Sequence, residues 1–273
     1  MIYLNYMTRL EALLKTAPDT RPILEALPIR QDPKGAAEAV LLLHGFTGNP
    51  SELATCAAAL AKAGYAVSVP RYPGHGTRRS DLMATRAEDW TRRAFDAYMD
   101  LRAQYPVVHV VGHSMGGLLA TAVAAAFEAP KLVLLAPAFK VTGQNLTLAQ
   151  LVAPLRLVLR RDRPLAAADE GNPIREALHG EYWADDLVAP AAELGRLILA
   201  CTRRLSVLRS RTRVIVGEKD AVVPVEVAEV VRTRAKDLAA FDKVLLPGAE
   251  PLFPFDAHAE ETARLVVEWI KSR

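Results

Sequence analysis

The sequence G-H-S-M-G-G at positions 112–117 lies between two apolar runs of different character. Residues 107–111 are mostly valine and fit a buried strand, whereas residues 117–127 fit a buried helix. A G-x-S-x-G sequence in this context predicts a sharp turn, in which closely packed glycines leave the Ser114 hydroxyl exposed at a helix N-terminus. The turn therefore predicts an α/β fold with Ser114 as a nucleophile.

The same region has the length of a membrane span, because residues 107–127 contain no Asp, Glu, Lys or Arg. The polar side chains of His109, His113 and Ser114 interrupt this stretch, as do several glycines. A strand, a turn and a buried helix explain it better than a lipid-facing helix. Residues 1–20 show no basic segment followed by an apolar one, so we expect no signal peptide.

Short apolar runs alternate with helix-like segments along most of the chain. This alternation predicts a mostly parallel β-sheet covered by helices on both faces. The strand-like runs are residues 39–43, 67–69, 107–111, 132–135, 214–216 and 244–246. The helix-like segments are residues 51–63, 88–104, 117–127, 225–236 and 260–270.

The alternation stops between residues 141 and 189, where prolines, charges and helical fragments occur without a strand-like run. We interpret residues 1–140 and 190–273 as the α/β core, and residues 141–189 as a small helical insertion. Such an insertion lies above the carboxyl ends of the strands, where ligands bind in this architecture. A lid over the active site is the functional interpretation, and an ordinary helical decoration is the alternative.

A second turn, HGFTG at residues 44–48, directly follows the strand-like run at residues 39–43. Acyl transfer needs two donors near the developing oxyanion. The backbone N–H groups of Phe46 and Met115 are the candidates, because Met115 begins the helix that follows Ser114. Taken alone, HGFTG is equally well explained as a turn with a satisfied histidine.

Several segments together resemble the bacterial carboxylesterase and monoacylglycerol lipase branch of the α/β-hydrolase superfamily. They are AVLLLHGFTGNPSEL, GYAVSVPRYPGHG, AEDW and VVGHSMGG, and the similarity resumes in RTRVIVGEKDAVVPVEVAEVV. The resemblance implies an α/β-hydrolase fold and hydrolysis of small or medium carboxylic esters, with monoacylglycerol as one candidate substrate. It implies no metal and no organic cofactor.

The acid of this superfamily usually stands in a G-x-x-D-x-x-V-P loop, which residues 217–224 match. By this resemblance Asp220 is the triad acid, which orients a histidine and stabilises its imidazolium. Glu218 is the substitute if Asp220 only caps the loop, since Asp in turns often bonds its own backbone.

The general base is less obvious than the nucleophile and the acid. In the family a histidine follows the last strand within a few residues, but Pro251 stands at that position here. His258, near the start of the final helix, is the histidine that follows, and we expect it to serve as the base if the loop brings it to Ser114. A solvated residue at a helix N-terminus is the alternative for His258. His179 in the insertion is a further candidate.

Two features of the insertion have both a functional and a structural interpretation. Trp183 and Tyr182 would line an acyl pocket, or they form the small core of the insertion itself. A group of arginines would meet an acidic substrate, although a solvated helix face explains it more simply. These arginines are Arg156, Arg160, Arg161 and Arg163.

Charge and cysteine content limit the functions and the cellular setting that the sequence allows. The formal net charge of +3 comes without a dense basic tract and gives no indication of nucleic-acid binding. Cys56 and Cys201 lie far apart and lack metal-ligand spacing, so we interpret them as small hydrophobic residues in a reducing, cytoplasmic setting. The partner expected is a small-molecule ester, without integral membrane association.

The sequence thus predicts a serine esterase in which Ser114, His258 and Asp220 form the triad. Without a base, a serine hydroxyl is a poor nucleophile. Because Pro251 stands where the family has its histidine, a second hypothesis stays open. In it the chain keeps the fold and pocket for ligand binding but is catalytically impaired.

Overall fold

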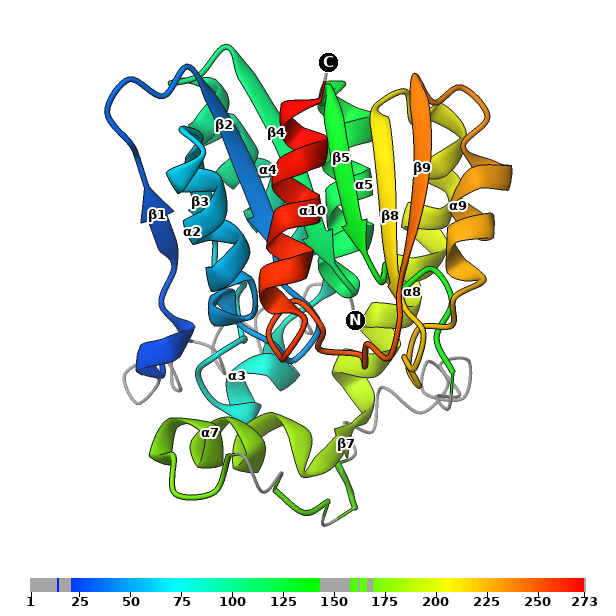
Figure 1. Ribbon diagram of the computed structural model, residues 1–273. Helices are drawn as coiled ribbons and strands as arrows, with labels where there is room; N and C mark the ends of the chain where they lie inside the picture. Colours follow the sequence, from blue (N-terminus) through cyan, green and yellow to red (C-terminus); the bar gives the residue numbers. More distant parts are fainter. Residues whose placement is uncertain (1–13, 15–20, 143–157, 162, 166–168, 273) are drawn as a thin grey trace.

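The computed structural model describes residues 14, 21–142, 158–161, 163–165 and 169–272. Its centre is a seven-stranded sheet in the order β1-β3-β2-β4-β5-β8-β9 (Figure 1). All neighbouring strands are parallel except β1, which pairs antiparallel with β3 at the edge. The strands are β1 (Ile29–Gln31), β2 (Glu38–Leu43), β3 (Ala66–Val69), β4 (Val107–His113), β5 (Lys131–Leu135), β8 (Arg211–Gly217) and β9 (Ala240–Leu246).

Helices cover both faces of the sheet, as the alternating pattern predicts. Figure 1 shows α2 and α10 in front of the sheet and α4, α5 and α8 behind it. The helices are α2 (Ala54–Lys62), α3 (Arg79–Ala84), α4 (Ala87–Arg102), α5 (Met115–Phe127), α7 (Pro173–Leu178), α8 (Val188–Arg204), α9 (Val227–Arg234) and α10 (Ala259–Lys271). The α/β class expected from the sequence is therefore confirmed.

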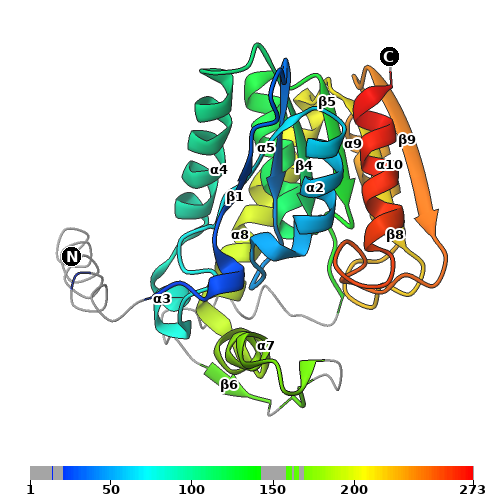
Figure 2. The ribbon, with the colours of Figure 1, turned by 60° about the vertical axis from the view of Figure 1, so that its left-hand side comes forward.

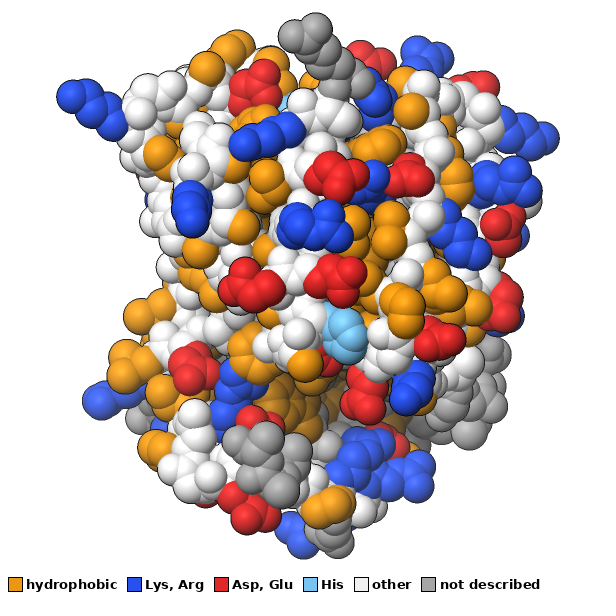
Figure 3. Space-filling model, in the orientation of Figure 1, with side chains coloured by type: hydrophobic (Ala, Val, Ile, Leu, Met, Phe, Trp, Pro, Cys, Tyr) orange, Lys and Arg blue, Asp and Glu red, His pale blue; other side chains and the backbone are white. Residues whose placement is uncertain are grey.

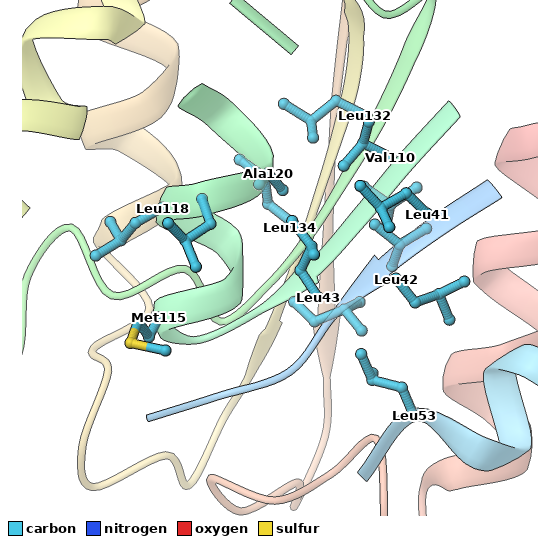
Figure 4. Close-up of a cluster of buried hydrophobic side chains, with 14 of the residues drawn as sticks. Leu41, Leu42, Leu43, Leu53, Val110, Met115, Leu118, Ala120, Leu132 and Leu134 are labelled. Atoms are coloured by element: carbon cyan, nitrogen blue, oxygen red, sulfur yellow. The ribbon is translucent and has the colours of Figure 1, made fainter. Parts of the chain in front are cut away.

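The core consists of the central strands and the helix that follows β4. Leu41, Leu42 and Leu43 of β2 are fully buried, and the side chains of β4 and β5 continue this layer toward α5 (Figure 4). Because parallel strands are covered on both faces, most side chains of such a run are apolar, with buried exceptions such as His109 of β4. The predicted strand–turn–helix over residues 107–127 is confirmed, as β4 and α5 around Ser114.

The insertion differs from expectation in one respect. We predicted no strand between residues 141 and 189, but β6 (Val158–Arg160) and β7 (Asp185–Leu187) form a small antiparallel pair. Each strand has only three residues, which is too short for a periodic pattern to be recognised. The described part of the insertion lies beyond the carboxyl ends of the parallel strands, below the core in Figures 1 and 2.

Two further observations concern the whole chain. Within the described ranges, no helix has the length and apolar character needed to cross a bilayer. Cys56 and Cys201 are both buried free thiols, and burial raises the pKa of each to about 12. Protonated, buried thiols fit the interpretation of both residues as small hydrophobic side chains.

Candidate active site

Ser114 lies in a strained turn between β4 and α5. Its backbone has φ 52° and ψ −116°, a conformation that residues with a side chain rarely adopt. The Ser114 N–H donates to the Leu135 carbonyl at 2.9 Å, and the Ser114 carbonyl accepts from Ala138 N at 3.1 Å. The neighbouring strand β5 and its loop therefore hold the serine in this conformation.

Glycines allow the second turn to approach the first. A Cβ on Gly116 would lie 2.0 Å from the Leu43 carbonyl oxygen, and one on Gly112 would lie 2.2 Å from the Gly116 carbonyl oxygen. Leu43 ends β2 and pairs with Gly112 of β4 in the parallel register. The two turns are therefore in direct backbone contact at the edge where ligands bind in such sheets.

The two candidate oxyanion donors lie in these turns. Met115 is the first residue of α5, so its N–H has no intrahelical acceptor. Phe46 follows β2 by three residues, and no described residue accepts a hydrogen bond from its N–H. Both N–H groups are thus available to an external acceptor, as an oxyanion hole requires.

A buried hydrogen bond between Glu52 and His113, which we did not predict, connects the two turns. Glu52 accepts from the Gly45 N–H at 3.0 Å and lies 3.3 Å from Nδ1 of His113. Burial opposes ionisation of Glu52, but the contact with His113 holds the pKa of its carboxyl group below the usual value. The carboxylate therefore connects the turn that carries Phe46 to the residue before Ser114.

Asp220 lies in the loop after β8, and one of its carboxylate oxygens caps that loop. Oδ1 accepts from the N–H groups of Val222 and Val223, each at 2.8 Å. Oδ2 is buried and has no hydrogen-bond partner among the described residues. Asp220 thus caps its loop, which was the alternative to a role as triad acid, but its second carboxylate oxygen is left for another donor. The substitute, Glu218, accepts from the Gly248 N–H at 2.8 Å.

The segment after β9 connects the Asp220 loop to the serine turn. At its start, Lys219 N donates to the Ala249 carbonyl at 2.9 Å. Two residues later, the Pro251 carbonyl lies 3.1 Å from Nε2 of His113. Pro251 therefore lies between the acid's loop and the nucleophile's turn.

His258 lies apart from these contacts, at the N-terminal end of α10. Its Nδ1 is 3.5 Å from Oδ1 of Asp256, and its backbone N–H donates to the same oxygen at 2.9 Å. Among the described residues, neither ring nitrogen has a hydrogen bond to Ser114 or Asp220. The structure therefore brings the two turns together but does not pair His258 with either partner. His179 has no such contact with a described residue either, and within the described part of the chain its buried Nε2 has no hydrogen-bond partner.

Hydrogen bonds connect the insertion to the core next to the two turns. Tyr182 OH donates to the Gly74 carbonyl at 3.1 Å and accepts from Thr77 N at 2.6 Å. The indole N–H of Trp183 donates to the Thr47 carbonyl at 3.2 Å. Where the core meets the insertion, the surface is hollowed and hydrophobic side chains lie inside the hollow (Figure 3).

Of the arginines expected to form a helix face, those that the structure describes lie at a strand and not on a helix. Arg160 ends β6, and Arg161 and Arg163 both pair with Asp186, while Arg156 lies outside the described residues. The expectation of a helical face was wrong because the arginines that are described flank a strand. Their charges are met by a neighbouring carboxylate at an exposed site, where such pairs contribute little to stability.

An aromatic cluster behind the HGFTG turn was also missed. It comprises His44, Phe46, Tyr72, His75 and Trp90. Burial lowers the pKa of His44 to about 4 and that of His75 to about 3, so both rings are neutral near pH 7. The signal was present in the YPGHG and AEDW segments, but the sequence alone did not show that these rings meet. No group suited to holding a metal ion occurs in the described part of the chain.

A strained serine between a parallel strand and a helix, with a second turn beside it, defines a nucleophile turn of the α/β-hydrolase type. A model of the alpha/beta hydrolase family matches residues 40–265, and the chain belongs to this family.

Two curated bacterial proteins match part of the chain. The thermostable monoacylglycerol lipase of Bacillus sp. (strain H-257) is 45% identical over 80 residues, which are 29% of this chain and 32% of that protein. The carboxylesterase of Bacillus subtilis (strain 168) is 40% identical over 86 residues, or 31% and 35% of the two chains. The matches thus span about a third of these relatives, and they confirm the resemblance to this branch.

Solved structures extend the likeness over nearly the whole chain. One, described with the metagenome-derived lipolytic enzymes LipS and LipT, has a TM-score of 0.80 at 23% identity, covering 93% of this chain and 100% of that one. The monoglyceride lipase of Saccharomyces cerevisiae has a TM-score of 0.72 at 14% identity, covering 89% and 90%. At these identities the likeness concerns the fold, which is therefore the expected α/β-hydrolase fold.

Proposed function

We propose that this chain is a carboxylic ester hydrolase that works through an acyl-enzyme on Ser114. The observation that carries the proposal is the strained Ser114 conformation at the start of α5, directly beside the turn that holds Phe46. Strain of this kind persists where the surrounding structure enforces it, and it clusters at functional sites. The partial matches to a monoacylglycerol lipase and a carboxylesterase support small or medium esters, with monoacylglycerol as a candidate.

The chemistry follows from the positions of the groups. As Ser114 Oγ attacks the ester carbonyl, a base takes up the hydroxyl proton, and the N–H groups of Phe46 and Met115 stabilise the oxyanion of the tetrahedral intermediate. The C–O bond to the leaving alcohol then breaks, and the base returns the proton to that alcohol. Water attacks the resulting acyl-enzyme in the same way and releases the carboxylic acid.

In this proposal His258 is the base and Asp220 the acid. The proposal requires the His258 ring to approach Ser114 and Asp220, since in the structure it makes no hydrogen bond to either residue and its Nδ1 lies 3.5 Å from Oδ1 of Asp256. The unpartnered Oδ2 of Asp220 supports it, because a buried carboxylate oxygen gains from a donor such as an imidazole N–H. Phe255 of the segment from residue 247 to residue 258 stacks on Arg175 of α7, so the insertion takes part in holding the segment.

We also propose that the insertion acts as a lid, that Trp183 borders the acyl group and that the protein works in the reducing cytoplasm. The hollow between core and insertion supports the first assignment. The hydrogen bond from Trp183 Nε1 to the Thr47 carbonyl, next to Phe46, supports the second. The two buried, unpaired cysteines support the third.

Turnover of p-nitrophenyl butyrate tests the proposal. We expect measurable hydrolysis by the wild-type chain and none by Ser114→Ala. Replacement of His258 by Ala should lower kcat by about 100-fold or more, the contribution typical of a positioned base. Cys201→Ser, a buried change away from the turns, is the control. Absence of turnover by the wild type across acetyl, butyryl and octanoyl esters would refute the proposal.

A second candidate function is ligand binding without efficient catalysis. Pro251 favours it, because its carbonyl contacts His113 at the place where a triad histidine would join the acid to the nucleophile. The discriminating result is binding of the product acids at the site, measured by calorimetry, together with unchanged background hydrolysis in Ser114→Ala.

A further inference from the structure

Thr47 holds an unusual place in the turn that carries Phe46. It has φ 58°, which is unfavourable for a β-branched residue and persists only when neighbouring groups enforce it. Three of the contacts that enforce this conformation are hydrogen bonds within the turn and with the segment that follows it. The Thr47 hydroxyl donates to the Phe46 carbonyl at 2.6 Å, Gly48 N donates to the Gly45 carbonyl at 3.3 Å, and Gly45 N donates to Glu52.

The fourth contact comes from the insertion. Trp183 Nε1 donates to the Thr47 carbonyl at 3.2 Å, so a residue 136 positions away in sequence is bonded to the peptide that follows the strained residue. Trp183 ends a π-helical turn, His179–Trp183, a geometry that is rare and frequent at functional sites. The preceding residue, Tyr182, is itself bonded to the core, so the indole is held in place.

We propose that Trp183 is a positioning residue for the oxyanion hole. Its N–H bond fixes the Thr47 peptide and thereby the orientation of the Phe46 N–H, so that the oxyanion hole is fully ordered only while the insertion is seated on the core. This inference rests on the proposed function, because it assigns the Phe46 N–H to the oxyanion. It goes beyond that function by making transition-state stabilisation depend on the position of the insertion.

The substitution Trp183→Phe tests the proposal, because it keeps an aromatic side chain and removes only the N–H donor and part of the ring. We expect kcat to fall about 3- to 10-fold, the effect of losing one hydrogen bond, with KM changed by less than about twofold. The fall should occur with p-nitrophenyl acetate as well as with p-nitrophenyl octanoate, because a bond to the turn that carries Phe46 affects every ester, whereas a contact with the acyl chain affects only the longer one. A fall confined to the octanoate, with a raised KM, would overturn the proposal and leave Trp183 as a pocket wall.

The matched control is Trp269→Phe. The Trp269 indole also donates to a backbone carbonyl, that of Arg211, at 3.3 Å, but it lies near the C-terminal end of α10. This variant loses the same kind of bond away from the turns, and its kcat should equal that of the wild type.

Hydrogen exchange separates failure of this inference from failure of the proposed function. In Trp183→Phe we expect faster amide exchange than in the wild type at Gly48, whose N–H donates to the Gly45 carbonyl inside the turn, and in Trp269→Phe we expect no change there. This comparison does not need turnover, so it decides the inference even if no ester is hydrolysed. Unchanged exchange at Gly48 in Trp183→Phe would overturn it.

Discussion

At the scale of single residues, the site contains a candidate nucleophile and a candidate acid, but Pro251 stands where the resemblance to the family predicts a histidine. Ser114 and Pro251 were both identified in the sequence, because the glycine pattern and the family's residue order are local signals. The pairing of His258 with Asp256 could not be predicted, since the path of the segment between Pro251 and His258 depends on contacts with distant residues. Among these contacts is the bond between His113 and the Pro251 carbonyl.

The change Pro251→His tests the role of this position. A histidine there would lie between the Asp220 loop and the Ser114 turn, so we expect it to act as the base without movement of the segment. Replacement of His258 by Ala should then lower kcat/KM in the wild-type background by about 100-fold and leave the Pro251→His background nearly unchanged. The measurement is a double-mutant cycle with p-nitrophenyl butyrate.

Pro251→Ala is the control for changes in the backbone of the segment. If His258→Ala lowers kcat/KM equally in the wild-type and the Pro251→His backgrounds, a histidine at position 251 does not act as the base. The assignment of position 251 to the base then fails.

At the scale of elements, apolar runs were sufficient to locate the six parallel strands and five of the main helices. The structure extends several of them by a few residues, as for β8, which begins at Arg211 rather than at residue 214. Several other elements, among them β1, β6, β7, α3 and α8, escaped detection for different reasons. β1 and β6 are short and partly exposed, and α8 begins inside the stretch assigned to the insertion. Their positions depend on tertiary contacts rather than on periodicity.

At the scale of the whole molecule, neutral buried histidines connect stability to pH. The pKa of His44 is about 4 and that of His75 about 3, both lowered chiefly by burial from the usual 6.5. Below pH 6.5 the unfolded chain binds protons that the folded chain excludes, so stability is full above that pH and decreases as the pH falls toward 4. Each of these two histidines should lower the free energy of unfolding by about 2 kcal/mol when the pH is lowered from 7.5 to 5.

Urea denaturation at the two pH values measures this loss. His75→Phe removes one of the two rings, and the loss between pH 7.5 and pH 5 should become smaller by about 2 kcal/mol. An equal loss in the variant and the wild type would show that His75 is not excluded from protonation in the folded state.

The central claim is that Ser114 is an activated nucleophile, and covalent labelling tests it most directly. The wild-type chain and Ser114→Ala would be incubated with a fluorophosphonate, which phosphonylates activated serines with loss of fluoride, and the intact mass and tryptic peptides would be measured. The account predicts one adduct per wild-type chain, on the peptide containing Ser114, and none on the variant. A wild-type chain that stays unlabelled, or equal labelling of the Ser114→Ala variant, would contradict it.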